Sequence, residues 1–544
     1  MARSKPRKLL LSSVWQPFGQ KYGDGFGTTC EGSHQLMWAQ GVFRTRATTT
    51  QWGIDFIAAN LEVPTTTLHY PTRAQFVAEL ENNYDYVGIA FVPATQHKMA
   101  EMTRAIRQHA PSSQIILGGY GTALADEFLP QVDHICRGEG VAFMRDLLGE
   151  PVDAPIEQPL ITQATKLFSV STGRDTGYVF AGLGCPNGCD FCATSHYFRR
   201  KHIRLLPDGR SILHAIQRMR DHFGDMRTFC IIDEDFLLNE ARGREFLEAV
   251  RGSDLPALSL NVFASVKALS RFSAAELVEM GVDIVWIGFE GMRTDYAKMS
   301  GRSYRDLFAD LHSHGISVLA SMIIGFDYQT PEIIWQEFEE LIGMRPSMCQ
   351  FLIYGPVFGT PAYHRLKSEG RVRDEVYREA SKHDGFSLGF DHPHMRAEEI
   401  EAIQRQLYKK AFERLGPGVL RVPEDWLAGF LNLRDHPAPR VRAKASHYGD
   451  AARRALQMIP ASKRYVSSTV RDWAEEFQQR LLTETGPLGS RERLVAHVVA
   501  PVLLRITDMK LRLGLGDQPE PTRRTFRMGD PHITTAHDLI AERV

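Results

Sequence analysis

The sequence predicts an α/β protein with an amino-terminal doubly wound, Rossmann-like domain, a central partial (β/α)6 TIM-like barrel and a helical carboxyl-terminal region. Strand and helix patterns alternate in two separate runs, and from about residue 375 only helical periodicity remains. Alternation of strands and helices indicates parallel sheets. We expect a first domain over residues 1–150, a linker over 151–177, a barrel over 178–370 and helices over 371–544.

The first run reads as buried strands separated by amphipathic helices. The expected strands are Lys8–Ser13, Tyr84–Val92, Gln114–Gly118 and His134–Arg137, and the expected helices are Gln75–Glu81 and Lys98–His109. Ligands of such sheets bind beyond the carboxyl ends of the strands. The segments that leave this edge are the Gly-rich stretch Gln16–Gly41, Pro93-Ala94-Thr95 and Gly118-Gly119-Tyr120-Gly121.

The second run contains six strand–helix units, which are too few for a closed eight-stranded barrel. The expected strands are Tyr178–Leu183, Thr228–Ile232, Ser259–Phe263, Ile284–Gly288, Ser317–Ile324 and Cys349–Tyr354. Barrel active sites form at the carboxyl ends of the strands. The helices that follow, clearest in Glu398–Leu415, Val441–Met458 and Tyr465–Leu482, are expected to cap or flank the barrel mouth. The polar stretch after Gly516 is expected to fray.

Charge and composition exclude several classes of protein. The chain has 64 basic and 65 acidic residues, which argues against a broad nucleic-acid footprint. It contains no run of about 18 apolar residues, so we expect no membrane span. Its basic start lacks the features of a signal peptide, and its seven cysteines form no disulfide framework, so we expect a cytoplasmic protein.

Three of the cysteines lie together in Gly184-Cys185-Pro186-Asn187-Gly188-Cys189-Asp190-Phe191-Cys192, directly after the first barrel strand. A short loop with these spacings brings three thiolates toward one point, and a four-iron cluster with three protein ligands keeps one iron open for a small molecule. A structural zinc site commonly uses a second cysteine pair, and a ferredoxin commonly uses a fourth nearby cysteine. This sequence has neither. The remaining cysteines, Cys30, Cys136, Cys230 and Cys349, are scattered and are expected to be small buried side chains.

With these motifs the sequence resembles the radical S-adenosylmethionine (SAM) superfamily, and within it the subgroup with an amino-terminal cobalamin (B12)-binding domain. The resemblance covers residues 8–370. It includes further blocks in the expected order: Ile231-Ile232-Asp233-Glu234-Asp235-Phe236, Ile287-Gly288-Phe289-Glu290-Gly291, Met322-Ile323-Ile324-Gly325-Phe326 and Gly355-Pro356-Val357-Phe358-Gly359-Thr360-Pro361.

The resemblance implies that Cys185, Cys189 and Cys192 hold a [4Fe-4S] cluster that reductively cleaves SAM to a 5′-deoxyadenosyl radical. It also assigns SAM contacts beyond the cysteines: Asp233, Glu234, Asp235, Glu290 and Gly325. The alternative readings are a solvated acidic turn after the second strand, a structural salt bridge at Glu290 and a plain strand-ending glycine at Gly325.

The same resemblance implies that the first domain binds cobalamin, supported by the block Arg137-Gly138-Glu139-Gly140. The expected contacts are Pro93, Ala94, Thr95, Gly118, Gly119 and Gly121. The Asp-x-His-x-x-Gly motif that ligates cobalt in many cobalamin proteins is absent, and His97 is expected to be an exposed residue instead. The other interpretation is a degenerate domain kept for structure.

The implied function is methyl transfer to an unactivated carbon of a small-molecule or lipid substrate, with an external electron donor of the flavodoxin or ferredoxin type. Oxidation, cyclisation or carbon–carbon bond formation is the alternative within the superfamily. A non-catalytic metal-binding or partner-binding protein is the alternative outside it. The apolar segment Leu494–Ile506 is either core of the helical region or a surface for lipid.

Overall fold

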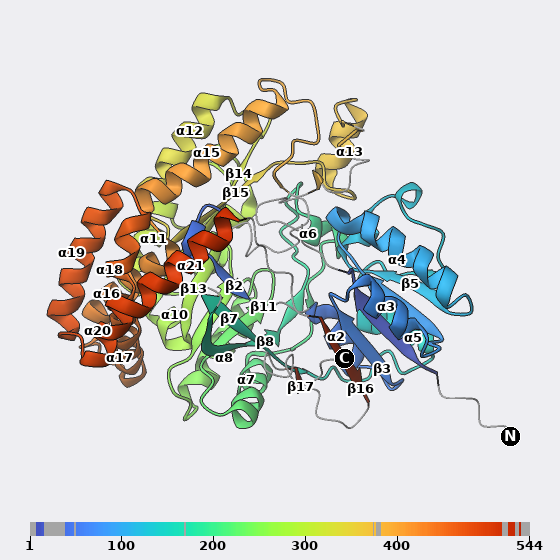
Figure 1. The fold of residues 1–544 in the computed structure, drawn as a ribbon, viewed down its shortest axis with the longest axis horizontal. Helices are drawn as coiled ribbons and strands as arrows, with labels where there is room; N and C mark the ends of the chain where they lie inside the picture. The colour runs from blue at the N-terminus through green and yellow to red at the C-terminus, as the bar shows by residue number, and fades with distance from the viewer. Residues whose placement is uncertain are drawn as a thin grey trace.

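A computed structural model describes residues 7–15, 38–47, 51–167, 170–373, 375–376, 382–383, 385–513, 521–527 and 533–534. Most of the predicted Gly-rich loop Gln16–Gly41, with Cys30, lies outside these residues. Figure 1 shows the amino-terminal α/β domain beside a central barrel, with the carboxyl-terminal helices on the opposite side of the barrel.

The amino-terminal domain is a sheet in the order β16-β3-β1-β4-β5-β6. Its strands are β1 (Leu9–Ser13), β3 (Thr65–His69), β4 (Tyr86–Ala90), β5 (Gln114–Gly118), β6 (His134–Ile135) and β16 (Thr522–Phe526). Its helices are α2 (Trp52–Ala59), α3 (Arg73–Leu80), α4 (Gln96–His109) and α5 (Gly140–Leu148). The predicted apolar stripe Met99, Met102 and Ile106 of α4 is fully buried against this sheet.

The barrel strands run parallel from β8 to β15, as the sequence predicts for a partial (β/α)6 barrel. They are β8 (Val170–Phe180), β11 (Thr228–Ile232), β12 (Ser259–Phe263), β13 (Val282–Phe289), β14 (Ser317–Ile324) and β15 (Met348–Ile353). The covering helices are α7 (Gly209–Phe223), α8 (Glu240–Arg251), α9 (Val266–Leu269), α10 (Ala274–Met280), α11 (Tyr304–Ser313), α12 (Pro331–Gly343) and α13 (Pro361–Ser368). The carboxyl ends of these strands form a common mouth that faces the amino-terminal domain (Figure 1).

The expectation of a linker over residues 151–177 is wrong for its second half. Strand β7 (Leu160–Leu167) pairs antiparallel with β8, which begins eight residues before the predicted first barrel strand. Strands β2 (Thr45–Ala47) and β17 (Ile533–Thr534) also pair with β7. The added strands cover the barrel edge at β8, which would otherwise expose unpaired backbone groups.

Two strands of the amino-terminal sheet were not expected. Strand β3 contains Thr65-Thr66-Thr67, and all five of its residues are buried although its pattern is polar. Strand β16 pairs antiparallel with β3 although the chain after Gly516 is expected to fray. The pair joins segments more than 450 residues apart, and the hydroxyls of Thr66 and Thr525 lie 3.1 Å from each other. The carboxyl-terminal segment therefore returns to the first domain.

The carboxyl-terminal helices contact the amino-terminal end of the barrel and its β15 edge, so they do not cap the mouth; His383 and Ser387 of the same region flank it. They are α15 (Ala397–Leu415), α16 (Gly418–Leu433), α17 (Pro439–Arg453), α18 (Ile459–Ser462), α19 (Ser468–Thr485), α20 (Ser490–Leu494), the π-helical turn η10 (Val495–Val499) and α21 (Ala500–Arg512). Asp425 of α16 accepts hydrogen bonds from Ser317, where β14 begins, and from Ser347, just before β15. On the edge, the hydroxyl of Tyr408 in α15 accepts the backbone N–H of Phe351 in β15 at 3.1 Å.

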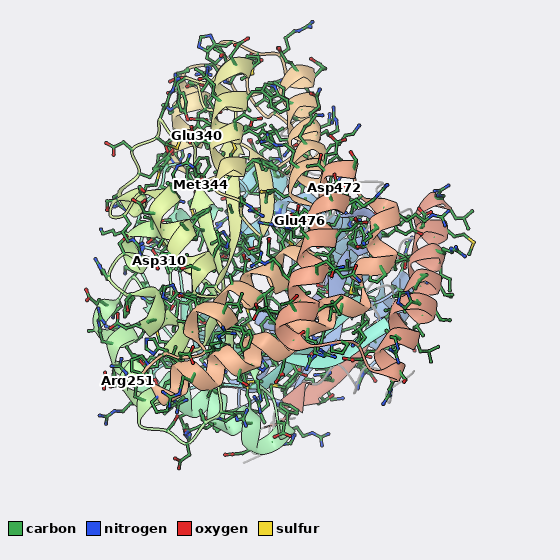
Figure 2. All side chains as sticks on the ribbon, turned by 90° about the vertical axis from the view of Figure 1, so that its left-hand side faces the viewer. Arg251, Asp310, Glu340, Met344, Asp472 and Glu476 are labelled. Atoms are coloured by element: carbon green, nitrogen blue, oxygen red, sulfur yellow. The ribbon has the colours of Figure 1, made fainter. Side chains whose placement is uncertain are left out.

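Figure 2 shows these helices from the side of the carboxyl-terminal region. The barrel helices α12, α11 and α8, marked by Glu340, Asp310 and Arg251, lie along one side, and α19, marked by Asp472 and Glu476, lies beside them. Among the described helices, none is long and apolar enough to cross a membrane.

One buried ion pair anchors α17 to the barrel. Lys444, which is 1% exposed, pairs with Asp283 at the start of β13, and the Tyr448 hydroxyl donates a hydrogen bond to the same carboxylate at 3.0 Å. Burial lowers the pKa of Lys444, although Asp283 opposes this shift. Breaking such a pair is costly because it leaves one buried charge uncompensated.

We therefore predict that Lys444→Met lowers the stability of the fold by about 3–5 kcal/mol, measured as a lower midpoint of denaturant unfolding. Adding Asp283→Asn to Lys444→Met should restore most of the loss, because both charges are then removed. The control Lys410→Met removes a surface ion pair with Glu413 and should change stability by no more than about 0.5 kcal/mol. Equal effects of Lys444→Met and Lys410→Met would contradict this interpretation.

Candidate active site

The cysteine loop is held in a tight conformation at the barrel mouth. It follows the short strand β9 (Gly182–Leu183) and runs into α6 (Ala193–Tyr197). Gly184 has φ +77°, and a Cβ there would collide with the carbonyl of Lys201. The hydroxyl of Ser195, on α6, donates to the carbonyl of Cys185 at 2.6 Å and accepts the N–H of Gly188 at 3.1 Å. The first turn of α6 thus folds the loop onto itself.

The three thiols of the loop lie in one electrostatic environment. Cys189 is 6% exposed, and burial raises its pKa to about 11. Burial also raises the pKa of Cys185 to about 12, and the neighbouring Cys189 and Cys192 add to this shift. These thiols are protonated at neutral pH, so binding a metal centre would release protons.

The loop contains the number of cysteines that an iron–sulfur cluster with one open iron takes. An iron–sulfur cube binds each thiolate at a different iron, and a cube with three protein ligands keeps one iron open. Cys185, Cys189 and Cys192 are all free cysteines of this loop. Among the described residues, no group of three His, Cys, Asp or Glu side chains is placed to hold one metal ion.

A partly buried cation lies beside these thiols. Lys298, in the turn η6 (Ala297–Met299) after β13, forms an ion pair with Glu290, which is 3% exposed. Its ammonium nitrogen also lies 5.5 Å from the ring centroid of Phe191. Burial opposes the charge of Lys298, but Glu290 and Cys189 outweigh burial and raise its pKa. A structural ion pair at Glu290, the alternative reading of this residue, is therefore present.

The acidic residues after β11 differ in what they contact. Asp233 is buried in an ion pair with Arg242 and lies 3.1 Å from the ring of His202. Asp235 accepts hydrogen bonds from the side chain of Asn187 and the backbone of Ser265.

Glu234 has a different environment at the mouth. Glu234 is exposed on this turn, whereas Asp233 and Asp235 are buried. Desolvation within the turn together with the charge of Asp233 raises the pKa of Glu234 to about 7.

Gly325, at the end of β14, has a local structural role. Its N–H donates to the side-chain oxygen of Gln329 at 2.6 Å, and its φ is +92°. A Cβ at this position would meet its nearest neighbour, Ile353, at 3.8 Å, which is an ordinary contact. The left-handed backbone therefore accounts for the glycine.

The cluster loop is docked onto the amino-terminal domain through α6. The hydroxyl of Tyr197 lies 2.8 Å from that of Thr122 and donates to the carbonyl of Gly119 at 3.2 Å. The Thr194 hydroxyl donates to that of Tyr120 at 3.3 Å. These partners are Gly119, which directly follows β5, and two residues of the next turn, η4 (Tyr120–Ala123). Sequence reasoning did not find this contact, because nothing in either segment marks its partner.

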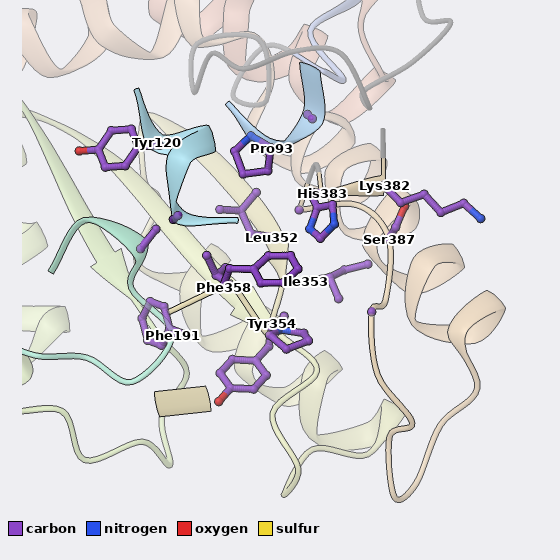
Figure 3. Close-up of a pocket in the computed structure, with 18 of the residues that line it drawn as sticks. Pro93, Tyr120, Phe191, Leu352, Ile353, Tyr354, Phe358, Lys382, His383 and Ser387 are labelled. Carbon is purple, nitrogen blue, oxygen red and sulfur yellow. The ribbon is translucent and has the colours of Figure 1, made fainter. Parts of the chain in front are cut away.

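A cavity of about 450 Å³ lies where the two domains meet (Figure 3). The amino-terminal domain contributes Pro93 and Tyr120 to its wall, and the cluster loop contributes Phe191 and Cys192. The ends of β14 and β15 supply a further apolar wall: Ile323, Leu352, Ile353, Tyr354, Val357 and Phe358. His383 and Ser387 lie at the remaining side. Of the residues that line the cavity, Pro93, Ala94 and Cys192 are the ones that the sequence analysis assigns as ligand contacts.

The predicted cobalamin contacts occupy different places around this cavity. Pro93 and Ala94, in η3 (Pro93–Thr95), line it, whereas Thr95 is buried and its hydroxyl donates to the carbonyl of Val92. Gly119 and Gly121 pack closely on Phe91, with no room for a Cβ at either position. They bring the chain back over β4. Gly118 has open space around its Cβ position, and His97 is exposed on α4 as expected.

The central part of the chain matches a known protein family. A model of the radical SAM superfamily matches residues 179–341, the segment that contains the cluster loop and barrel strands β11 to β14. Residues 179–341 therefore form a radical SAM domain, and the protein is a radical SAM enzyme. The superfamily uses a [4Fe-4S] cluster and SAM, which the three thiols and the open barrel mouth fit.

Three proteins are similar to this chain over more than half of its length. Bacteriochlorophyllide d C-12(1)-methyltransferase of Chlorobaculum tepidum is 23% identical over 335 residues, 56% of this chain and 70% of that protein. Anaerobic magnesium-protoporphyrin IX monomethyl ester cyclase of Rubrivivax gelatinosus is 21% identical, over 53% of this chain and 60% of that protein. The radical SAM methyltransferase TsrM of Kitasatospora setae, solved with cobalamin and a [4Fe-4S] cluster, shares the fold with a TM-score of 0.53 at 14% identity, over 83% of this chain and 100% of that one.

We predict that Cys189→Ala abolishes cluster assembly, because two thiolates remain where three are needed. Anaerobically reconstituted wild-type protein should contain about four irons per chain, and the variant well under one. The matched control is Cys349→Ala, which removes a buried thiol of β15 and should keep full iron content. Full iron content in Cys189→Ala would contradict the assignment.

We also predict that Lys298→Met lowers the midpoint potential of the cluster, because a nearby positive charge favours the reduced, more negative state. If the removed charge interacts with the cluster by about 2 kcal/mol, the change in potential is on the order of 100 mV. Lys298→Arg keeps the charge and should restore most of the potential. Potentiometric titration followed by electron paramagnetic resonance (EPR) measures it, and an unchanged potential in Lys298→Met would exclude this role.

Proposed function

We propose that this radical SAM enzyme is a cobalamin-dependent methyltransferase that acts on an unactivated carbon of a small-molecule or lipid substrate. One observation carries the proposal: the cluster loop and the carboxyl edge of the amino-terminal sheet form two walls of a single cavity. When bound, the cluster would supply the electron that cleaves SAM, and cobalamin would carry the methyl group.

In this proposal the polar residues of the mouth bind and orient SAM. Cys185, Cys189 and Cys192 hold the cluster, and the pair of Lys298 and Glu290 places one positive and one negative charge beside it. Glu234 is our candidate for the SAM ammonium group, because Asp233 and Asp235 are already engaged with Arg242, Asn187 and Ser265. Asp233 and Asp235 then act by holding this turn in place.

The apolar wall of the cavity supports radical chemistry. Leu352, Val357 and Phe358 offer no polar group that would hold water near a reactive carbon. Excluding water suppresses side reactions of a reactive intermediate. Tyr354 adds one hydroxyl, which donates to Asp190 in the cluster loop at 3.0 Å.

The amino-terminal domain fits cobalamin by the position of its loops. Ligands of doubly wound sheets bind at the carboxyl edge of the strands. Pro93, Ala94, Tyr120 and Ala123 reach the cavity from this edge, after β4 and β5. Gly119 and Gly121 permit this by letting the second loop pack on Phe91, so their role in the proposal is indirect.

A second candidate function is oxidation or cyclisation without methyl transfer. The observation that favours it is the similarity to a monomethyl ester cyclase, which matches nearly as much of this chain as the methyltransferase does. Both candidates share the cluster, SAM and an external electron donor of the flavodoxin or ferredoxin type. Three reduced thiols in an open loop fit a reducing compartment such as the cytoplasm.

The fate of the SAM methyl group separates the two candidates. We predict that reduced, cobalamin-loaded enzyme supplied with trideuteromethyl-SAM and an extract of cells lacking the gene forms a product about 3 Da heavier than the product formed with unlabelled SAM. S-adenosylhomocysteine and 5′-deoxyadenosine should accumulate in equal amounts, measured by mass spectrometry. Deoxyadenosine with an unlabelled product would instead favour oxidation or cyclisation.

We further predict that Ala123→Trp, which fills the wall on the side of the amino-terminal domain, weakens cobalamin binding at least tenfold. Iron content should stay at the wild-type level, since the cluster loop is on the other wall. Ala78→Trp, on the exposed side of α3 in the same domain, is the control and should bind cobalamin normally. Undiminished binding to Ala123→Trp would place cobalamin elsewhere.

A further inference from the structure

The helix formed by α20, η10 and α21 exposes a row of large apolar side chains to solvent. This apolar face consists of Leu494, Val498, Val499, Val502, Ile506, Met509 and Leu513, each 40–64% exposed. Among the described residues, only two other large apolar side chains, Val152 and Met292, are as exposed, and they lie on separate segments. Scattered exposed apolar residues are ordinary, but a contiguous row indicates an interaction surface.

The opposite side of the same helix already packs on the protein. Ala500 and Leu504 are buried against Val42 and Phe43, and Ala496 is fully buried as well. One interpretation of this segment is packing in the core of the helical region. Core packing accounts for the inner side of the helix, but it does not explain why the apolar face is exposed.

Helix α19 of the same region shows the ordinary alternative. Its outer side carries Asp472, Glu475 and Glu476 (Figure 2). The apolar face is thus a property of one helix and is not shared by this neighbour.

Positive charge accompanies the apolar face. Residues 490–513 contain five basic and two acidic residues, although the whole chain has a net charge of −1. Arg491, Arg493, Arg505 and Arg512 are exposed along the helix. The two acidic side chains are paired, Glu492 with Arg453 and Asp508 with Arg512, each at 2.9 Å.

We propose that the apolar face binds the surface of an anionic lipid bilayer, with the helix lying in the plane of the membrane. An apolar row accompanied by arginines matches the acyl boundary and the negative headgroups of such a surface. A second copy of this chain fits less well, because a twofold contact would bring the same arginines of both copies together. The proposal does not depend on methyl transfer or on cobalamin.

Flotation of the full-length, cluster-loaded protein with lipid vesicles tests this. Wild-type protein should float with vesicles of phosphatidylcholine and phosphatidylglycerol and bind vesicles of phosphatidylcholine alone at least tenfold more weakly. Val502→Glu combined with Ile506→Glu should reduce binding to the anionic vesicles at least tenfold, because both charges would enter the acyl boundary. Val152→Glu, an equally exposed position outside the helix, is the matched control and should bind as wild type.

A second variant tests the charge without adding one to the apolar face. Arg491→Gln combined with Arg505→Gln should weaken binding by about fivefold for each arginine, and raised salt should weaken wild-type binding in the same way. Failure of wild-type protein to float, or equal flotation of all variants, would overturn the proposal. The proposal would also be overturned if the wild-type protein bound no vesicles but formed a dimer, and if Val502→Glu combined with Ile506→Glu made that dimer monomeric.

Discussion

The docking of α6 onto the loop after β5 is the contact on which the rest of the site depends. Tyr197 and Thr194 lie on α6, the helix that follows the cluster loop, and their hydroxyls contact those of Thr122 and Tyr120 in the amino-terminal domain. The same helix fixes the loop itself through Ser195. One short helix thus sets the conformation of the cysteine loop and its position relative to the other sheet. The cavity between Cys192 and Pro93 is a consequence of that placement.

The remainder of the fold stabilises this arrangement from outside the mouth. The carboxyl-terminal helices bind the opposite end of the barrel through Asp425 and Lys444, which leaves the mouth open to the amino-terminal domain. Strand β16 returns to the amino-terminal sheet and β17 to the barrel sheet, so the last described segments contact both halves. Both domains and the carboxyl-terminal region therefore contribute to one interface.

The sequence alone predicts those parts of the structure that a short run of residues determines. The cysteine spacing and the apolar runs of β11, β12 and β14 predict the cluster loop and these strands with their observed bounds. The sequence does not predict strands that form because a distant segment of the chain pairs with them. Strand β3 is rich in threonine, and β16 becomes a strand only because β3 accepts it.

The candidate site likewise contains residues that the sequence predicts and residues that only tertiary contacts bring together. The cysteines follow from their spacing, but the pairing of Asp233 with Arg242 and the position of Lys298 beside Cys189 arise from tertiary contacts. Tyr120 and Tyr197 contact each other's domains across the interface, and no periodicity in either segment reveals it. The SAM and cobalamin contacts assigned by residue number remain predictions.

The central claim is that the cluster loop and the sheet edge place two cofactors in one cavity. Pulsed EPR on anaerobic protein that contains a reduced cluster and cobalt(II) cobalamin measures this most directly, because both centres are paramagnetic. The account predicts a magnetic dipolar coupling between the two spins that disappears in protein without the cluster. Two full-intensity, uncoupled spectra would contradict it, since the cofactors would then lie in separate sites.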